Sequence, residues 1–277
     1  MNLATVIEGI ERQAFKYAVE SPADYIGENG LLYCGNCHTA KQHRGNFLGV
    51  ERVVPCICKC RQEQIEAEAK ARQREAMQKT IKEYRRMGFP ESDMQHWTFD
   101  NAEDCKIISA AKRYVDNFQQ FKDNGKGLLL YGGVGTGKTF AAACIVNALI
   151  DMGKPCLITN FSRVLNTLWG IDEKQAYIDS LNKFDLLVLD DLGIERQSEY
   201  VQEQVFNVID SRYRARLPLI ITTNLQLEEI VSPANVGNGR IYDRVLEMCH
   251  PVKVEGESRR RKKVKSGFSD MNEMLGL

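Results

Sequence analysis

The sequence lacks three features that would assign its class immediately. Its 277 residues carry 37 basic and 37 acidic side chains, so no excess charge marks the whole molecule as a nucleic-acid binder, and any basic surface must be local. No apolar run approaches the roughly 20 residues that a membrane-spanning helix needs. The N-terminus shows no basic stretch followed by an apolar one, so we expect no signal peptide. These absences predict a protein of the reducing cytoplasm with no membrane partner.

A glycine-rich segment is the most informative feature that is present. Residues 132–139 read G-G-V-G-T-G-K-T and fit the phosphate-binding P-loop pattern G-x-x-x-x-G-K-[ST]. An apolar run of strand length, 127–131, precedes the loop, and a stretch rich in helix formers, 140–150, follows it. In that context backbone N–H groups and a helix N-terminus surround phosphate oxygens. The sequence therefore predicts a nucleoside triphosphate site formed by Gly132, Gly133, Val134, Gly135, Thr136, Gly137, Lys138 and Thr139.

Individual side chains of this site have distinct expected roles. Lys138 would reach the β- and γ-phosphates, and Thr139 would offer its hydroxyl to Mg²⁺. About 50 residues further on, 184–191 read F-D-L-L-V-L-D-D, which is the Walker B pattern of a buried parallel strand that ends in carboxylates. We expect Asp190 to hold the magnesium ion and Asp191 to orient the attacking water.

Three later segments add polar residues that could serve the same site. Asn224 follows an apolar strand, 217–223, and a polar residue at that tip can touch the γ-phosphate and the catalytic water. Arg240 and Arg244 are four residues apart on one helix face and could reach the γ-phosphate of a neighbouring subunit. The basic run 258–263 suits a γ-phosphate arginine, a DNA-facing patch or a solvated tail.

Five of the nine cysteines are clustered near the N-terminus. Cys34 and Cys37 form a C-x-x-C knuckle, and after 18 intervening residues the second group contains Cys56, Cys58 and Cys60. Two cysteine groups about 15–20 residues apart are a common framework for structural zinc. Thiolates bind Zn²⁺ tetrahedrally, and the metal supplies folding free energy that so short a segment cannot obtain from a core. We expect Cys34, Cys37 and two of the last three cysteines to be the ligands.

Other interpretations of the cluster remain open. His38 and His43 lie between the two groups and could replace a thiolate. A disulfide is disfavoured in the cytosol, and the Gly-Asn turn inside the knuckle does not suit a redox motif. The isolated cysteines are interpreted as small buried hydrophobic residues; they are Cys105, Cys144, Cys156 and Cys249.

The chain is expected to form three parts. Residues 1–60 would contain a short amphipathic helix (Val6, Ile10, Ala14, Tyr17) and the zinc-binding module. Residues 61–94 are rich in Arg, Lys, Glu, Gln and Ala with sparse apolar positions, which predicts a solvated helical arm. Residues 95–277 would form an α/β domain with a parallel sheet flanked by helices, opened by a helix over 102–121.

Taken in chain order, these motifs resemble the DnaC/DnaI-type replicative helicase loaders, which are AAA+ ATPases related to DnaA and to the IstB transposition helper. The resemblance rests on the P-loop, the Asp-Asp Walker B, Thr-Thr-Asn (222–224), G-R-I-Y-D-R (239–244) and G-E-S-R-R (256–260). The segment W-T-F-D (97–100) is similar to the opening of that domain. The knuckle resembles the module with which DnaI-like and phage-encoded loaders grip the helicase, whereas IstB-type helpers generally lack one.

The resemblance implies a role for several residues. Asn224 would be sensor 1, Arg244 the trans-acting arginine finger with Arg240 beside it, and Arg260 (or Arg259) sensor 2. A helix at 162–169 would be associated with single-stranded DNA. The candidates there are Arg163, Asn166 and Trp169, although we expect Trp169 to be a core residue. Asp191 departs from the common Asp-Glu Walker B, which places the carboxylate about 1.5 Å further back and predicts slow turnover, as in a switch.

The function implied is ATP-dependent loading of a hexameric replicative helicase onto single-stranded DNA at replication initiation. ATP and Mg²⁺ bound between subunits would hold loaders in a ring or spiral, Zn²⁺ would fold the helicase-binding module, and hydrolysis, stimulated by DNA, would release the helicase. Two alternatives are an IstB-type transposition helper that binds duplex DNA and an adaptor that binds ATP without hydrolysing it.

Overall fold

The computed structural model describes residues 21–47, 49–89, 92–193, 198–233 and 236–259, together with Met271, Met274 and Leu275. The expected amphipathic helix around Val6 and the sensor-2 candidate Arg260 lie outside this part of the chain. Two compact units are present, Met1–Gln78 and Lys79–Leu277. The predicted boundary between arm and α/β domain at residues 94 and 95 lies later in the chain than the junction of these units.

The first unit is built from two short antiparallel hairpins. Strand β1 (Tyr25–Ile26) pairs with β2 (Leu32–Tyr33), and β3 (Gln42–Phe47) pairs with β4 (Val50–Pro55). Asp24, which directly precedes β1, accepts hydrogen bonds from two residues of the segment between the hairpins: the backbone N–H of Gly35 at 3.1 Å and the ammonium of Lys41. The Lys41 contact lowers the pKa of Asp24 to about 2. Among the described side chains from residue 21 to residue 78, few apolar ones are buried, so hydrophobic burial contributes little to the stability of this part.

Helix α2 (Lys59–Gly88) has the polar, exposed surface predicted for an arm. It ends at Gly88, where a Cβ would lie 2.5 Å from the carbonyl oxygen of Cys156. Ile81 and Tyr84, in its last turns, pack against the core of the second unit, and Phe89 is buried directly after it. Of the helices in the described ranges, none is both long and apolar enough to cross a bilayer.

The second unit contains a five-stranded, all-parallel sheet in the order β6-β7-β8-β5-β9. The strands are β5 (Gly127–Tyr131), β6 (Cys156–Asn160), β7 (Leu186–Leu192), β8 (Leu219–Thr223) and β9 (Cys249–Lys253). Its central strands are continuous apolar runs because helices cover both faces. This confirms the predicted AAA+ architecture of a parallel sheet flanked by helices.

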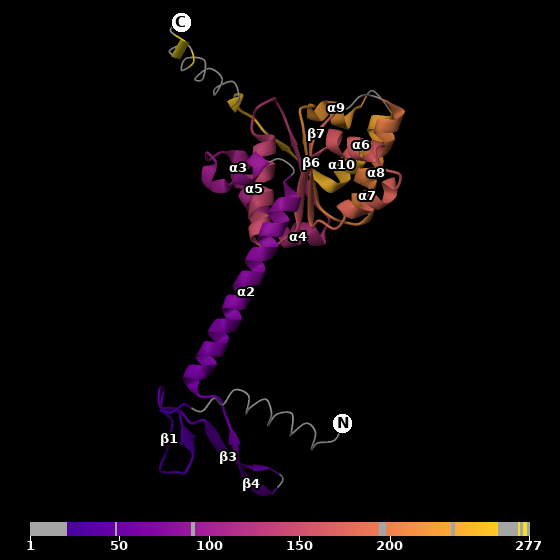
Figure 1. Ribbon diagram of the computed structural model, residues 1–277. Coiled ribbons are helices and arrows are strands. Elements are labelled where there is room, and N and C mark those ends of the chain that lie inside the picture. Colours follow the sequence, from indigo (N-terminus) through magenta and orange to yellow (C-terminus); the bar gives the residue numbers. More distant parts are fainter. Residues whose placement is uncertain are drawn as a thin grey trace. The chain divides into compact units, whose positions relative to one another are not determined.

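Along each strand, side chains point alternately to the two faces of the sheet and pack into a separate hydrophobic core on each face. Leu128 and Leu130 of β5 pack with α3 (Lys106–Asp116) and α5 (Lys138–Asp151), whereas Leu129 packs on the opposite face. That opposite face is covered by α6 (Phe161–Trp169), α7 (Lys174–Leu181), α8 (Glu199–Arg214) and α10 (Val236–Met248) (Figure 1). The remaining short helices are η1 (Ser92–His96), η2 (Phe99–Asn101), α4 (Phe118–Asp123) and α9 (Leu227–Val231).

The single helix expected over 102–121 is wrong in detail, since the chain forms two helices, α3 and α4, that meet at Asn117. Asn117 leaves the helical conformation (φ −107°, ψ 17°) and its side-chain amide donates to the carbonyl oxygen of Arg113 at 2.9 Å. Such local side-chain bonds compete with the helical pattern. The scattered cysteines match expectation at Cys144, Cys156 and Cys249, which are buried, whereas Cys105 is partly exposed.

One fully buried arginine holds the amino-terminal edge of the sheet together. The guanidinium of Arg212 donates to the carbonyl oxygens of Leu181 (3.3 Å), Phe184 (2.8 Å), Asp185 (3.2 Å) and Pro218 (2.9 Å). These carbonyls belong to the segments that lead into β7 and β8. Burial lowers the pKa of Arg212 to about 10, so the side chain stays charged at neutral pH and supplies strong, charge-assisted hydrogen bonds.

Replacing Arg212 with Met should therefore lower the free energy of unfolding by about 3 kcal/mol or more, because each buried acceptor left unsatisfied costs about 1–3 kcal/mol. Arg214→Met is the matched control: its side chain is 78% exposed and forms an ion pair with Asp210, so the loss should stay below about 1 kcal/mol. Urea denaturation of the two variants measures both values. Equal losses would show that Arg212 does not anchor the sheet.

Candidate nucleotide site and cysteine cluster

The glycine-rich loop joins β5 to α5 at the carboxyl edge of the sheet. Gly132, Gly135 and Gly137 have φ angles of 135°, 78° and 103°, a region that side-chain-bearing residues rarely adopt. A Cβ on Gly132 would lie 2.5 Å from the carbonyl oxygen of Val254, and one on Gly135 would lie 2.2 Å from the hydroxyl oxygen of Ser258. The loop conformation therefore requires the glycines that the motif contains.

Lys138 lies inside this loop with 5% of its surface exposed. Its Nζ donates to the carbonyl oxygens of Gly132 (2.9 Å) and Gly133 (2.8 Å) and to Oδ1 of Asn224 (2.8 Å). The structure thus brings Asn224, at the tip of β8, against the lysine expected to hold the β- and γ-phosphates. A γ-phosphate bound by Lys138 would lie within reach of this amide.

The two predicted magnesium ligands are also adjacent. The hydroxyl of Thr139, in the first turn of α5, donates to the carboxylate of Asp190 at 2.9 Å. Burial, and secondarily the neighbouring Asp191, raise the pKa of Asp190 above its ordinary value. A divalent cation would offset this cost by stabilising the ionised carboxylate. Hard oxygen donors of this kind fit Mg²⁺, which usually keeps several waters and one or two carboxylates.

Asp191 has an unusual backbone conformation for a residue within a strand. Its φ is 60°, in the left-handed region, and it lies at a register shift between β7 and β8. Non-glycine residues in that region are uncommon, and Asp is one of the types that tolerate it. The conformation separates Asp191 from the regular ladder at the position expected to orient the attacking water.

A C-terminal arginine also contacts the P-loop. The backbone N–H of Arg259 donates to the carbonyl oxygen of Gly135 at 2.9 Å, and its guanidinium lies 3.6 Å from the carboxylate of Glu103. The position a Cβ would take on Gly137 is 3.9 Å from Nε of Arg259. Of the two sensor-2 candidates, Arg259 is therefore beside the loop, and Arg260 lies outside the described residues.

Arg244 lies far from its own P-loop, at the amino edge of the sheet. Its guanidinium is 3.4 Å from Asp210 and 3.2 Å from Glu247, and it stacks 4.2 Å above the ring of Tyr213. Because the strands are parallel, Glu247, just before β9, lies at the edge opposite to the loop that follows β5. Arg240, one turn nearer the start of α10, is exposed. Arg244 can thus serve a nucleotide site only in a neighbouring subunit.

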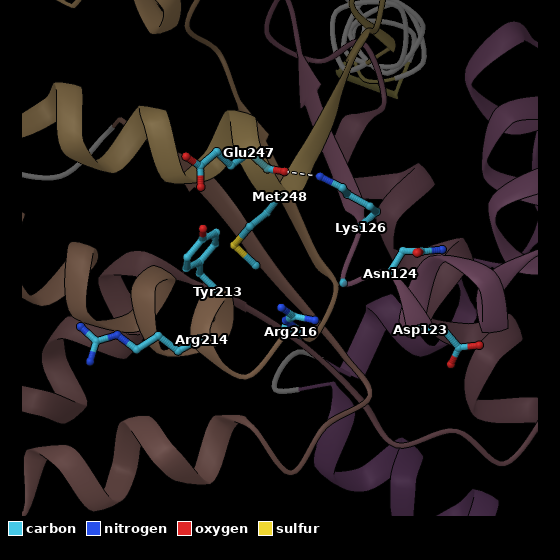
Figure 2. Close-up of a pocket in the computed structure, with 9 residues that line it drawn as sticks. Asp123, Asn124, Lys126, Tyr213, Arg214, Arg216, Glu247 and Met248 are labelled. Carbon is cyan, nitrogen blue, oxygen red and sulfur yellow. Dashed lines mark hydrogen bonds between the residues drawn. The ribbon is translucent and has the colours of Figure 1, made fainter.

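A cavity of about 400 Å³ opens at this amino edge (Figure 2). Its lining contains charges of both signs: the acidic residues Asp123 and Glu247 and the basic residues Lys126, Arg214 and Arg216. Lys126 donates to the carbonyl oxygen of Glu247, the contact drawn as a dashed line in Figure 2. The cavity contains none of the P-loop or Walker B residues, so it is separate from the nucleotide site.

The expectation that Trp169 is a core residue is wrong. The apolar stripe of α6 consists of Phe161, Val164, Leu165 and Leu168. Trp169 is one residue after Leu168 and about 100° from it around the helix, and it is 57% exposed. Arg163 and Asn166 are exposed on the same helix.

An aromatic partner that sequence reasoning missed lies under Trp169. The indole stacks on the ring of Tyr200, with centroids 6.2 Å apart and planes 10° apart. Lys174 lies 5.0 Å from the centroid of the same ring and donates to its hydroxyl at 2.9 Å. Because Tyr200 is 31 residues away on α8, no local pattern indicated this pair.

Four of the five clustered cysteines meet at one point in the first unit. The Sγ atoms of Cys34, Cys37, Cys58 and Cys60 all lie within 4.8 Å of one another. The knuckle turn supplies the first pair, whereas Cys58 immediately precedes α2 and Cys60 lies in its first turn. Sequence reasoning left open which of the last three cysteines would join the set.

The other candidate metal ligands make contacts outside this cluster. Cys56 donates its thiol to the carbonyl oxygen of Ala40 at 3.3 Å, and burial raises its pKa. His38 contacts the hydroxyl of Tyr25 at 3.3 Å, and His43 pairs with Val54 within the β3–β4 hairpin. Neither histidine belongs to the group of four.

The chemistry of this donor set suits zinc. A hydrogen bond from the hydroxyl of Thr39 lowers the pKa of Cys37 to about 5, while the neighbouring sulfurs of Cys37, Cys58 and Cys34 raise the pKa of Cys60 to about 12. Four ionised thiolates at this separation repel one another unless a cation lies between them. Four sulfur ligands favour tetrahedral Zn²⁺, so these residues fit the ion.

Comparisons with known proteins give one family match and several similar proteins. The sequence profile described as IstB-like ATP binding protein matches residues 62–267, more than half of the chain. The chain belongs to this family. The chain is also 26% identical over 200 residues to the replicative helicase loader DnaI of Bacillus subtilis, an alignment that covers 66% of this chain and 64% of that protein. It is 29% identical over 162 residues to the replicative helicase loader DnaC of Escherichia coli, covering 54% and 63%.

A solved structure shares the fold of this chain. The crystal structure of DnaI superimposes with a TM-score of 0.52 at 25% identity, covering 62% of this chain and 95% of that chain. The resemblance to DnaC/DnaI-type proteins is thereby confirmed. The chain spans slightly less than two thirds of the length of the two curated relatives.

The full-length protein, purified without chelator, should contain one zinc ion per chain. Cys58→Ser should lose the metal and destabilise the first unit, because structural zinc contributes directly to folding. Cys56→Ser should retain it, since that thiol contacts a backbone carbonyl instead. Elemental analysis together with circular dichroism before and after chelation measures both. Zinc loss in Cys56→Ser with retention in Cys58→Ser would refute this ligand assignment.

Proposed function

We propose that this protein is an ATP-dependent loader of a hexameric replicative helicase. The observation that carries the proposal is the presence, in one chain, of a P-loop ATPase unit and a four-cysteine cluster. The similarity to the loaders named DnaI and DnaC supports it. The first unit grips the helicase, and the second unit assembles with ATP in the cytoplasm.

The geometry of the second unit supports separate roles for the residues of the ATP site. Loop N–H groups and Lys138 bind the phosphates, and Thr139 with Asp190 holds Mg²⁺. Asp191 and Asn224 orient the water. Bound nucleotide supplies the γ-phosphate, whose presence or absence selects between two arrangements of the assembly.

Self-association follows from the position of Arg244. At the edge opposite to its own loop, it completes the site of the adjacent subunit, with Arg240 nearby. Such a heterologous contact generates a ring if it closes and a spiral if it does not. Ion pairs to Asp210 and Glu247 hold Arg244 in the free chain, and engagement with a neighbouring γ-phosphate exchanges them for the phosphate.

Single-stranded DNA binds along α6. Arg163 and Asn166 offer polar contacts to the backbone, and the exposed indole of Trp169 offers a stacking surface, already backed by Tyr200. Stacking of an unpaired base on an aromatic side chain contributes about 1–3 kcal/mol. DNA bound here stimulates slow hydrolysis, after which the helicase is released.

A second candidate is a transposition helper that binds duplex DNA, as the resemblance to IstB-type helpers implies; membership of the IstB-like ATP binding family is compatible with it. That function needs tight, salt-sensitive duplex binding and no helicase contact. The cysteine cluster would then have no assigned partner, which is why we favour helicase loading.

Affinity capture of the full chain from lysate of its source cells, with ATP and Mg²⁺, tests the function. We expect the wild type to recover the replicative helicase, identified by mass spectrometry, and Cys58→Ser to lose it. Lys138→Ala shows whether ATP governs the grip, while Cys56→Ser is the matched control and should behave as the wild type. Recovery of a transposase without the helicase would replace the loader proposal by the transposition helper.

Arg244→Ala should lower DNA-stimulated ATPase activity by roughly 10³-fold, the usual contribution of an arginine finger. Arg214→Ala is the matched control, because Arg214 pairs with the same Asp210 but should leave turnover unchanged. Mixing Arg244→Ala with Lys138→Ala should restore part of the activity, since the second variant supplies the missing arginine to the intact P-loop of the first. Absence of rescue in a mixture that still co-assembles would exclude a shared site.

A further inference from the structure

The Walker B strand and its neighbour β8 lose their regular pairing where the aspartates occur. The register runs Leu189↔Ile221 and resumes at Leu192↔Thr223. Two residues of β7, Asp190 and Asp191, therefore face one residue of β8, which is a β-bulge. The single residue opposite the bulge is Thr222.

The hydroxyl of Thr222 contacts both aspartates. It donates to Oδ1 of Asp190 at 2.5 Å and accepts the backbone N–H of Asp191 at 3.0 Å. A threonine hydroxyl has one donor and two acceptor lone pairs, so both bonds form at once. Thr222 is fully buried, and water is therefore excluded as a substitute partner on that side.

Each of the two bonds fixes a different property of the site. Asp190 receives hydroxyl donors from Thr139 and from Thr222, and together they orient its carboxylate. The bond to the N–H of Asp191 supports a backbone with a φ of 60°. A residue in the left-handed region is held there only by its surroundings, at a cost of about 1–3 kcal/mol, so removal of the bond lets the bulge relax.

The adjacent threonine provides a natural contrast. Thr223 is equally buried, but its hydroxyl donates to the carbonyl oxygen of Leu192 at 2.7 Å and accepts the N–H of Leu225 at 3.1 Å. Both partners are backbone groups outside the aspartate pair. Thr223 therefore closes the end of the bulge without touching Asp190 or Asp191.

We propose that Thr222 is a positioning residue for ATP hydrolysis, whose one hydroxyl sets the Asp190 carboxylate for Mg²⁺ and holds the Asp191 backbone in the conformation that orients the attacking water. The inference rests on the proposed ATPase function. Thr222 itself touches neither phosphate nor water; it acts through the two aspartates.

The test compares Thr222→Val with Thr222→Ser and Thr223→Val in the full chain. Valine keeps the shape of threonine and removes only the hydroxyl, whereas serine keeps the hydroxyl. In Thr222→Val we expect kcat to fall about 10- to 100-fold and the Mg²⁺ concentration for half-maximal nucleotide binding to rise by a similar factor, as for lost outer-shell partners of metal ligands. Binding of a fluorescent ATP analogue at saturating Mg²⁺ should stay within about twofold of the wild type.

Controls separate positioning from stability. Thr222→Ser should restore kcat and the Mg²⁺ requirement to near wild-type values. Thr223→Val should lower the melting temperature at least as much as Thr222→Val while leaving the Mg²⁺ requirement unchanged. A Thr222→Val variant with the wild-type kcat and Mg²⁺ requirement would refute the positioning role, as would loss of both in Thr223→Val to the same extent.

Failure of the proposed function gives a different result. A folded wild type that binds nucleotide but shows no turnover with DNA and helicase would overturn the hydrolysis proposal. The Mg²⁺ dependence of nucleotide binding needs no turnover, so in that case it decides alone whether Thr222 orients Asp190. Lys138→Ala, which should bind nucleotide weakly, is the negative control for the binding measurement.

Discussion

The parallel alignment of the five strands is the constraint on which the nucleotide site depends. Parallel strands deliver all their carboxyl ends to one edge, so the loop after β5, the aspartates of β7 and Asn224 after β8 meet there although they are distant in sequence. At the other edge Arg212 joins the segments that lead into β7 and β8. The same geometry places Arg244 at that far edge, away from the P-loop of its own chain.

The site combines features that destabilise a folded chain with bonds that hold them in place. Asp190 is a buried carboxylate whose ionisation burial opposes, and Asp191 occupies a conformation that is unfavourable for a side-chain-bearing residue. Two threonine hydroxyls and the lysine–asparagine contact stabilise this arrangement. Electrostatic strain of this kind is typical of functional sites, where the ligand completes the set of charges.

The two units are stabilised by different means. The second unit buries continuous apolar strands between layers of helices, which is sufficient for a domain of its size. In the described part of the first, two short hairpins bury few apolar groups. The Asp24–Lys41 ion pair stabilises this part, and the four-cysteine cluster is suited to contribute folding free energy by holding a metal ion. Helix α2 has residues in both units. Its surface is mostly polar and exposed, so it buries few apolar side chains.

The sequence alone determined the P-loop, the Walker B strand, the role expected of Asn224 and the two-part cysteine framework. Each depends on residues close together in the chain, whose spacing expresses backbone geometry directly. The tertiary structure decided what depends on distant segments: that Cys58 and Cys60 rather than Cys56 join the knuckle, that Arg259 lies against the P-loop, and that Trp169 is exposed on Tyr200. The contacts of Thr222 also depend on distant segments, because the residue opposite a bulge belongs to a different strand and is known only once the strand pairing is known.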